Sequence, residues 1–375
     1  MSVSGPLPPL HLLLGGDVML GRLVARVLAS EGPDYPFAAL SAVTAGADLF
    51  FVNLECALSA RRQHFSGASK AFYFRAEPDA VRVLESAGVD LVSLANNHVL
   101  DADVGGLSDT LEILARHGIA SVGAGADLAA ASAIRELDCR GVRLGVLAVC
   151  DHQPDFAAGD HRPGIHYLDL EDRESRHSLV ERVRREATRF DHLIVSLHWL
   201  PNWVPAIPEA CRQLADELVG AGARVLWGHS PHHILGTQWW PRGVALYSTG
   251  DLIDDYALDP VYRNDRQLLY LLELGPGRVE RVTALPVTLD VGRAEPADHE
   301  ASVWIEAWLR ADCRPLGSSV AAIAGDGFEI LPGEIGPAEI GPGEIGPGEI
   351  GPGKIGPSKI GPGMAGGSHD AARAR

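Results

Sequence analysis

Five short apolar segments of this chain each end on residue types that can bind a metal ion. The segments lead into Asp17, Glu55, Asn97 with His98, His198 and His229. Carboxylate, amide and imidazole groups together suit catalytic divalent ions such as Mn²⁺, Fe²⁺ and Zn²⁺ better than Ca²⁺. Ligands of open α/β sheets bind just beyond the carboxyl ends of the strands, so we expect these residues to meet at one rim. The sequence therefore predicts a metal centre built from strand ends.

Each of these residues also has a plainer interpretation when it is taken alone. Asp17 can cap the helix expected directly after it, because a carboxylate there accepts free backbone N–H groups. Glu55 can form an ion pair with an arginine, and the polar run 96–98 can be a loop before the next helix. A lone histidine such as His198 is more often a core residue than a ligand. The metal centre is favoured because all the positions coincide with strand ends.

The segment GHSPHH gives the strongest pair of histidines. His229 and His232 lie three residues apart, Gly228 permits a close approach of the backbone, and Pro231 stiffens the loop. We expect His233 to point away from the pair because it begins the next strand. Two glycines also precede Asp17, and we expect them to let the chain turn tightly after the first strand.

The elements that must position these residues follow a βαβ rhythm up to about residue 230. Apolar runs predict strands near 10–15, 47–53, 90–95, 119–122, 142–149, 191–197 and 224–227. Helical spacing of apolar residues predicts helices at 20–32, 77–88, 105–118 and 208–222, each closed by a glycine, with another within 171–189. This alternation is typical of a mainly parallel sheet with helices on its faces. After residue 233 strands predominate, which favours an antiparallel group.

The chain divides into three predicted parts. Residues 1–295 form the catalytic domain, 296–328 a C-terminal helical extension, and 329–375 a tail in which Gly-Pro-Glu-Ile units recur every five residues. One apolar residue and one proline in each unit cannot build a core, so we expect the tail to be disordered.

Composition excludes several classes of protein. The net charge of −17 argues against nucleic acid and anionic membranes as partners, although bound metal ions can still attract an anionic substrate. Five scattered cysteines without CxxC spacing argue against a disulfide framework or a zinc knuckle. No stretch has the length and apolarity of a signal peptide or a membrane span, so we expect a cytoplasmic protein. The oligomeric state is left open.

In these motifs the chain resembles the CapA family, named for poly-γ-glutamate capsule biosynthesis, within the calcineurin-like metallophosphatase superfamily. The family's ordered motifs appear as GGDVMLGR, VNLECALS, LANNHVLDADVGG, SLHWLPNW, GHSPHH and YSTGDLIDDY. The resemblance spans about residues 10–255. It departs from the pattern at Leu200, which replaces the glycine of HWG, and at Asp251, which replaces an asparagine. Met19 stands where the superfamily's opening Asp-x-His has its histidine.

The resemblance implies a four-layer αββα sandwich, an α/β (α+β) fold, with a two-metal centre at the strand ends. By this resemblance Asp17 binds one metal, Glu55 lies where the superfamily bridges two, and Asn97 and His198 bind the second. His229 and His232 complete the ligand set, and His98 is the acid beside the metals. Beside these residues, we predict that Asn96, Arg22 and Arg75 bind an anionic substrate, with surface ion pairing as the alternative role for the two arginines.

These expectations lead to two hypotheses about function. The first is a hydrolase with two divalent ions (Mn, Fe or Zn) that cleaves a phosphoester or a γ-glutamyl or amide bond in poly-γ-glutamate, capsule or cell-envelope metabolism. The second is a non-catalytic binding or assembly partner of a polyglutamate synthesis complex.

Overall fold

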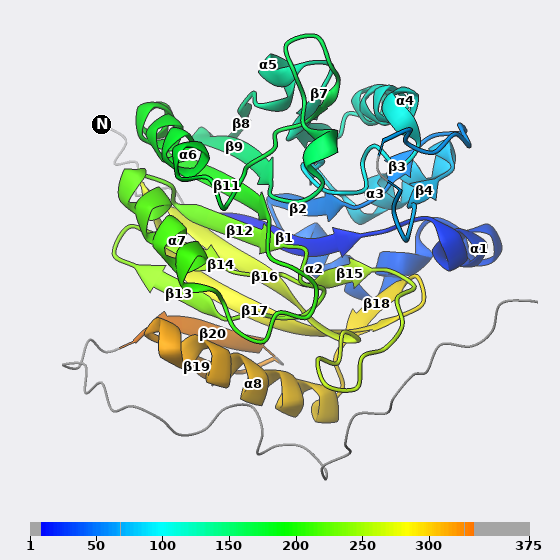
Figure 1. Ribbon diagram of the computed structural model, residues 1–375. Helices are drawn as coiled ribbons and strands as arrows, with labels where there is room; N and C mark the ends of the chain where they lie inside the picture. The colour runs from blue at the N-terminus through cyan, green and yellow to red at the C-terminus, as the bar shows by residue number, and fades with distance from the viewer. Residues whose placement is uncertain (1–8, 68, 326, 334–375) are drawn as a thin grey trace, which may run out of the picture. The chain divides into compact units, whose positions relative to one another are not determined.

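The fold was analysed in a computed structural model, which describes residues 9–67, 69–325 and 327–333. Two large β-sheets form its centre (Figure 1). The first contains, in spatial order, β19 (Ser318–Ile323), β20 (Gly327–Pro332), β17 (Arg278–Asp290), β16 (Arg266–Gly275), β1 (Leu10–Val18), β2 (Leu49–Leu54), β5 (Leu91–Ser93) and β6 (Ala120–Val122). Two short strands extend it, because β15 (Asp251–Ile253) pairs with β1 and β18 (Arg293–Pro296) pairs with β17.

The second sheet is built mainly from the middle of the chain. Its order is β13 (Thr237–Trp240), β14 (Gly243–Leu246), β12 (Val225–His229), β11 (His192–His198), β9 (Val142–Cys150) and β8 (Arg135–Cys139). Two further pairs lie outside both sheets: β3 (Ala57–Leu58) with β4 (Arg75–Ala76), and β7 (Ala124–Gly125) with β10 (Gly164–Ile165). The parallel strands before residue 230 therefore form two groups: β1, β2, β5 and β6 in the first sheet, and β9, β11 and β12 in the second.

The two sheets pack face to face through an apolar interior. Phe51 of β2 and Trp227 of β12 lie 6.4 Å apart between ring centroids, and the Trp227 indole N–H donates to the Gly15 carbonyl at 3.0 Å. These strands are fully buried, which explains why they are near-continuous apolar runs in the sequence. The same close packing brings the end of β1 beside the end of β12.

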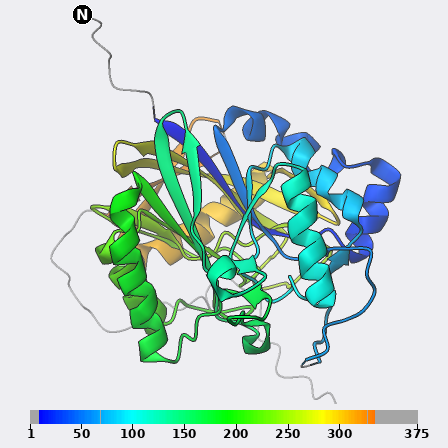
Figure 2. The ribbon, with the colours of Figure 1, turned by 90° about the horizontal axis from the view of Figure 1, so that it is seen from above.

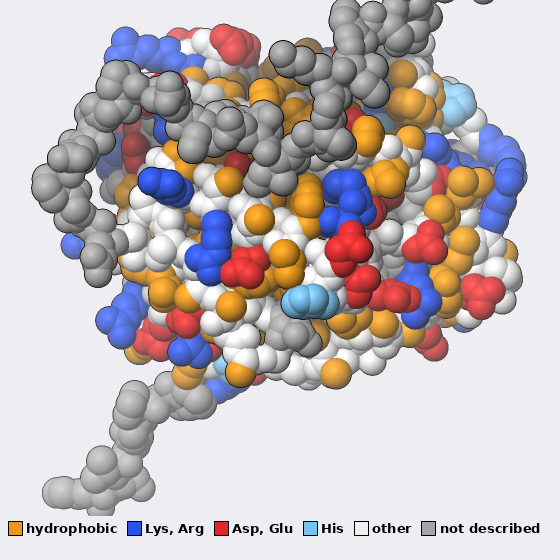
Figure 3. Space-filling model, turned by 90° about the horizontal axis from the view of Figure 1, so that it is seen from below, with side chains coloured by type: hydrophobic (Ala, Val, Ile, Leu, Met, Phe, Trp, Pro, Cys, Tyr) orange, Lys and Arg blue, Asp and Glu red, His pale blue; other side chains and the backbone are white. Residues whose placement is uncertain are grey.

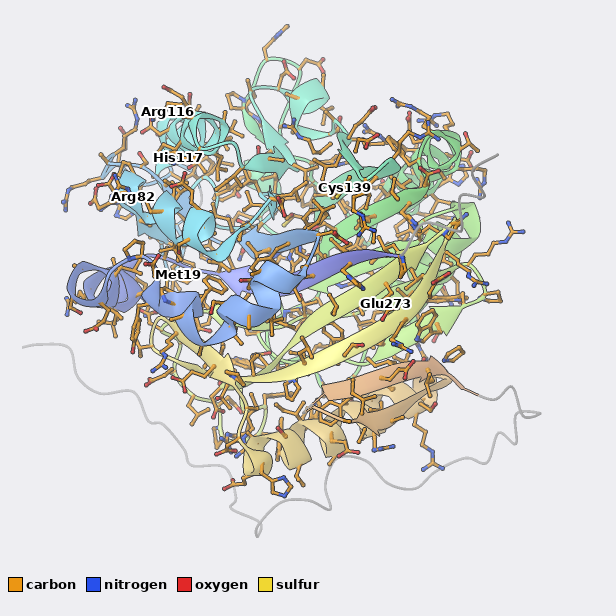
Figure 4. All side chains as sticks on the ribbon, turned by 180° about the vertical axis from the view of Figure 1, so that it is seen from behind. Met19, Arg82, Arg116, His117, Cys139 and Glu273 are labelled. Atoms are coloured by element: carbon orange, nitrogen blue, oxygen red, sulfur yellow. The ribbon has the colours of Figure 1, made fainter. Side chains whose placement is uncertain are left out.

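Helices form the two outer layers. The elements are α1 (Arg22–Glu31), α2 (Ser41–Gly46), α3 (Val81–Ala87), α4 (Asp103–Arg116), α5 (Leu128–Ala131), α6 (Arg173–Glu186), α7 (Glu209–Ala221) and α8 (His299–Cys313). Helices α6 and α7 pack on the outer face of the second sheet, where Leu214 and Leu218 join a separate apolar cluster. Figure 2 shows α6 (green) and α4 (cyan) on opposite sides of the strands, and Figure 4 shows α2 and α3 from behind. The predicted four-layer αββα sandwich is confirmed.

The chain around residues 296–333 differs from the expected helical extension. Helix α8 is followed by the hairpin β19–β20, which joins the first sheet through β17. Strand β20 continues to Pro332, beyond residue 329, where we expected the tail to begin. The reason is that Phe328 and Ile330 point into the core, so this stretch has apolar residues to bury. The repeats of the tail lie outside the described residues.

Three other features bear on the sequence-based expectations. Gly15 and Gly16 do not form a turn, because β1 continues through Val18. Among the described residues no helix is both long and apolar enough to cross a membrane.

Seen from below, acidic and basic side chains are interspersed over the face of the molecule (Figure 3), so the negative charge is not gathered there.

Burial of Asp312 in α8 makes stability depend on pH. Burial raises its pKa to about 7 from an ordinary value of 3.8, so the folded protein holds this proton more tightly than the unfolded chain. The stability contributed by the neutral acid is complete below about pH 4 and is lost as the pH rises to about 7. We therefore expect Asp312→Asn to stabilise the fold at pH 8 but not at pH 4.

Urea unfolding at the two pH values measures this difference. Each pKa unit corresponds to about 1.4 kcal/mol, and partial solvation reduces the full effect, so we expect a gain of about 1–2 kcal/mol at pH 8. Glu306→Gln, on the same helix, is the matched control and should show no such gain. An Asp312→Asn protein that is no more stable than wild type at pH 8 would refute the prediction.

Candidate metal centre

Strand register places Asp17 between two other polar side chains. Strand β1 runs parallel to β2 and to β15, with Asp17 opposite Asn53 on one side and Asp251 on the other. The Asn53 amide donates to Asp17 Oδ1 at 2.8 Å. Gly16 permits this crowding, since a Cβ there would lie 2.0 Å from the Gly250 carbonyl oxygen. The glycine before Asp17 therefore serves close packing and not a turn.

The second sheet supplies two histidines in the same way. Strands β11 and β12 are parallel, and His198 is in register with His229. Their Nδ1 atoms lie 2.8 Å apart, and His229 Nε2 lies 2.8 Å from the Ser196 hydroxyl. His198 Nε2 lies 3.1 Å from the Asn97 side-chain oxygen, which comes from the loop after β5. Three of the predicted ligands thus meet across the two sheets.

Asp17 belongs to two groups of side chains that can each hold a metal ion. One group is Asp17, His198 and His229, and the other is Asp17, His232 and Asp251, with one donor atom from each residue within 4.8 Å of the others. His229 Nδ1 lies 3.8 Å from Asp17 Oδ1, and His232 Nδ1 lies 3.7 Å from Asp17 Oδ2. A single carboxylate shared by two groups is the arrangement expected of a bridging ligand.

The electrostatics of this cluster favour a cation. Burial raises the pKa of Asp17, and burial with the charge of Asp17 raises the pKa values of Glu55 and Asp251 far above their usual range. One oxygen of each of these three carboxyl groups is buried without a hydrogen-bond partner. Unpaired buried carboxylates are costly, and a bound divalent ion removes that cost. The residues present therefore fit a metal site.

The histidines are suited to the same role because they are held neutral. Burial lowers the pKa of His229 to about 3 and lowers the pKa values of His198 and His232 as well. Neutral imidazole nitrogen is the form that binds a metal. Four of the six predicted metal ligands, Asp17, His198, His229 and His232, are thus in the two groups.

Glu55 and Asn97 border these groups. Glu55 follows β2, is buried, and has Oε1 at 3.8 Å from His98 Nε2, its one ion-pair partner among the described residues. An arginine partner, the alternative considered for Glu55, is therefore absent from this part of the chain. Asn97 touches His198 with its side-chain oxygen. The bridging role of Glu55 and the ligand role of Asn97 stay predictions, and both residues are within reach of the cluster.

His98 forms a pair with Asp101 beside the cluster. His98 Nδ1 lies 2.5 Å from Asp101 Oδ2, and the His98 ring stacks on Phe74 with centroids 3.8 Å apart. Burial lowers the pKa of His98 to about 4, so its ring is neutral at pH 7. Its other nitrogen, Nε2, faces Glu55. The arrangement can exchange a proton at Nε2 with a group bound at the metal centre.

The three residues predicted to bind substrate lie in different settings. The Asn96 amide is buried and forms its hydrogen bonds within the protein. It donates to Asn53 Oδ1 at 3.0 Å and accepts from the His98 N–H at 3.0 Å. It braces the loop that carries Asn97 and His98. Arg22 is half-exposed, with its guanidinium 5.6 Å from the centre of the Phe74 ring and Nε at 3.4 Å from Asp255.

Arg75 faces a separate hollow at the outer side of Asp101. It lines a cavity of about 220 Å³ together with Arg62, Gln63, His64, Tyr73, Asp101 and Ala102. Its guanidinium donates to the Ser59 carbonyl at 2.5 Å and to Glu77 at 2.9 Å. Substrate binding by Arg22 and Arg75 stays a prediction, and both remain accessible to an anion.

Asp251, the residue that replaces the asparagine of the family motif, is the first residue of β15 and joins one of the two groups. Two further participants, Asp101 and Lys70, were not among the predicted site residues. Asp101 had a weak signal, because the family motif has an Asp and a Gly after ANNH. Lys70, whose Nζ donates to Asp101 Oδ1 at 2.5 Å, lies in a long loop without any motif. Its one signal is that it is the only lysine before residue 354.

Backbone strain is concentrated in the loops around the centre. Six of the nine non-glycine residues with positive φ in the described chain are Arg22, Gln153, Leu200, Trp203, Ser230 and His232. Leu200 has φ of 72° and stands where the family motif has glycine, the residue that adopts this conformation without strain. Its N–H donates to Asp151 at 3.2 Å, which helps to hold it there. Such strain is typical of functional sites.

The shared position of Asp17 leads to a test by metal analysis. We expect Asp17→Asn to reduce binding at both groups, because the amide supplies a weaker donor without charge. Asp251→Asn, which restores the family residue, should weaken only the group that contains His232. Metal content measured after reconstitution with Mn²⁺ distinguishes the two variants.

Thermal unfolding gives the matching control. Without metal, Asp17→Asn should raise Tm because it removes a buried, uncompensated acid, while the rise in Tm on adding Mn²⁺ should be lost. Equal metal content in wild type and Asp17→Asn would contradict the assignment of Asp17 as a shared ligand.

Known proteins are similar to this chain over most of its length. Residues 11–256, well over half of the chain, match the model of the bacterial capsule synthesis protein family PGA_cap. The chain is 30% identical over 365 residues to a probable polyglutamine synthesis accessory protein of Mycobacterium tuberculosis, covering 86% of this chain and 96% of that one. It is 28% identical over 284 residues to the PGA biosynthesis protein CapA of Bacillus subtilis, covering 75% and 72%.

Solved structures align at lower similarity. A hypothetical protein from Thermus thermophilus is 17% identical with a TM-score of 0.47, covering 75% of this chain and all of that one. A putative 5'-nucleotidase from Staphylococcus aureus is 12% identical with a TM-score of 0.43, covering 80% and 59%. The family match spans every strand end that carries a predicted ligand. The chain therefore belongs to the PGA_cap family of bacterial capsule synthesis proteins, the CapA family.

Proposed function

We propose that this protein is a metal-dependent hydrolase of the CapA type. The observation that carries the proposal is the pair of metal-binding groups that share Asp17, directly beside the His98–Asp101 pair. A purely structural metal site has no use for a histidine–carboxylate pair that faces it. Bound divalent ions supply a Lewis acid for the scissile bond and lower the pKa of a coordinated water to near 7. We infer two such ions, Mn, Fe or Zn, from the mixed carboxylate and imidazole donors.

The chain's own residues supply the proton transfer and the charge balance. His98 Nδ1 is occupied by its contact with Asp101, so Nε2 is the atom that exchanges a proton with the reacting groups. Because the free ring is neutral at pH 7, Nε2 must take up a proton before it can protonate a leaving group. Arg22, which lies beside Phe74, supplies a positive charge for an anionic substrate.

Two substrate classes fit the site. A phosphoester fits two groups of metal-binding side chains, because two bound divalent ions would stabilise the negative charge of a phosphoryl group. A γ-glutamyl or other amide bond fits the family, since the Bacillus subtilis relative is named for PGA biosynthesis. An anionic substrate of either class would meet a positive charge at Arg22, whose side chain is 37% exposed. We place the activity in poly-γ-glutamate, capsule or cell-envelope metabolism.

A second candidate is a binding or assembly role in a polyglutamate synthesis complex. The observation that favours it is the name of the Mycobacterium tuberculosis relative, an accessory protein. In that case metals are structural or absent, and the His98–Asp101 pair has no chemical task. Protein purified without chelators that contains no stoichiometric transition metal would favour this role over hydrolysis.

Hydrolysis depends on His98 if the proposal is right. Mn²⁺-loaded protein should hydrolyse bis(p-nitrophenyl) phosphate or a γ-glutamyl peptide, and His98→Ala should lower kcat by about 10²- to 10⁴-fold through loss of proton transfer. His161→Ala, which removes an exposed histidine far from the strand ends in sequence, is the control and should leave the rate unchanged. Equal turnover by His98→Ala and wild type would rule out this mechanism.

A further inference from the structure

The only lysine before residue 354 is buried beside the catalytic pair. Lys70 lies in the loop between β3 and β4, and its side chain is 8% exposed. The other basic residues of this stretch of chain are arginines and histidines, and most arginines lie at the surface. A buried ammonium group requires acceptors for its protons, so its position is informative.

The acceptors for Lys70 belong to Asn97 and Asp101, which lie before and after His98 in the sequence. Its Nζ donates to Asp101 Oδ1 at 2.5 Å and also to the Asn97 carbonyl oxygen, and it lies 5.1 Å from the centre of the Phe156 ring. The lysine therefore bonds both to the residue that precedes His98 and to the carboxylate that pairs with His98.

A second residue of the same loop completes this contact. The Phe74 N–H donates to Asp101 Oδ2 at 2.6 Å, while the Phe74 ring stacks on the His98 imidazole. Between them, the Tyr73 hydroxyl accepts from the Lys70 N–H at 3.1 Å, which fixes the turn from Lys70 to Phe74. The loop thus contacts His98 and Asp101 from two directions. We call residues 70–74 the clamp.

The hydrogen bonds of Asp101 indicate which nitrogen of His98 carries the hydrogen. Asp101 Oδ1 accepts from Lys70, and Oδ2 accepts from Phe74 and lies 2.5 Å from His98 Nδ1. Two acceptors do not approach to 2.5 Å, so a hydrogen lies between Oδ2 and Nδ1. With the ammonium group beside Oδ1, that hydrogen belongs to Nδ1, which leaves Nε2 free. Nζ at 3.2 Å from Nδ1 is then a close approach of two donors and not a hydrogen bond.

We propose that Lys70 is a positioning residue that holds His98 in the Nδ1–H tautomer with Nε2 open toward the metal centre. Without the ammonium group, Asp101 can carry the hydrogen itself and donate it to Nδ1, and the imidazole then carries its hydrogen on Nε2. That tautomer places an N–H, and not a free acceptor nitrogen, on the side of the metal centre. An ammonium group suits the position because it is compact and offers three donors, two of which are used here.

Tautomers can be read directly from the metal-free protein. In ¹⁵N-histidine-labelled protein, two-bond ¹H–¹⁵N correlations distinguish Nδ1–H from Nε2–H, and His98→Gln identifies the His98 signals. We expect wild type to show the Nδ1–H pattern. Lys70→Met should convert most of it to Nε2–H, and Lys70→Arg, which keeps the charge, should restore the wild-type pattern at least in part. An unchanged pattern in Lys70→Met would overturn the proposal.

The control and the fallback come from the same loop. Arg61→Met removes a cation that pairs with Asp109 on the outside of the loop and should leave the His98 signals unchanged. If Lys70→Met does not fold, Lys70→Gln keeps a polar side chain without the charge and is expected to shift the tautomer in the same direction. A shift of equal size in Arg61→Met would also contradict the proposal, since it would reflect general loosening of the loop.

Kinetics supply a second readout, which rests on the proposed hydrolysis. With bis(p-nitrophenyl) phosphate and Mn²⁺, Lys70→Met should lower kcat about 10- to 100-fold, as for other residues that orient a catalytic group, with little change in KM. A rise in KM with unchanged kcat would instead assign Lys70 to substrate binding. If wild type shows no hydrolysis, the proposed function fails, while the tautomer measurement still decides the role of Lys70.

Discussion

Burying Asp17, Glu55 and Asp251 in one small volume costs free energy that rises with each added negative charge. The fold accepts this cost at the carboxyl ends of β1, β2 and β15, where strand pairing leaves these side chains little freedom to separate. Three carboxyl oxygens lack partners, and the surrounding histidines are neutral. These protein groups leave buried carboxyl oxygens without partners, and a bound cation would supply one.

Much of the surrounding structure serves to hold this cluster. Gly16 lets β1 approach Gly250 closely, and the stacked sheets bring His198 and His229 over Asp17. Strained residues such as Leu200 and His232 lie in the loops that carry or support the ligands. Strain and uncompensated charge both lower stability, and both are concentrated at the same place. The large apolar interface between the sheets offsets them.

The His98–Asp101 pair is supported by a different part of the chain. The clamp contacts His98 and Asp101, while the Asn96 amide holds their loop by donating to Asn53. These supports are joined to the predicted metal ligands, because Lys70 donates to the Asn97 carbonyl and Asn53 donates to Asp17. The position of His98 and the geometry of the cluster therefore depend on one another.

The sequence by itself determined the strand ends and the residue types that they carry. Apolar runs of strand length end on Asp17, Glu55, His198 and His229. Buried strands must consist of apolar residues, so the sequence itself shows where they lie. Glycines at helix ends marked α1, α3, α4 and α7, because each has a positive φ that a glycine adopts without strain. The order of the motifs was sufficient to indicate the family and its four-layer fold.

Only the tertiary structure decided which ligands form a group. The βαβ rhythm did not show that the parallel strands divide into two sheets, because pairing between distant strands leaves no local pattern. The sharing of Asp17, the entry of Asp251 and the burial of Lys70 all depend on that pairing. Strand β20 was not predicted, because its apolar residues lie directly before the repetitive tail. Only the pairing with β17 shows that they belong to the core.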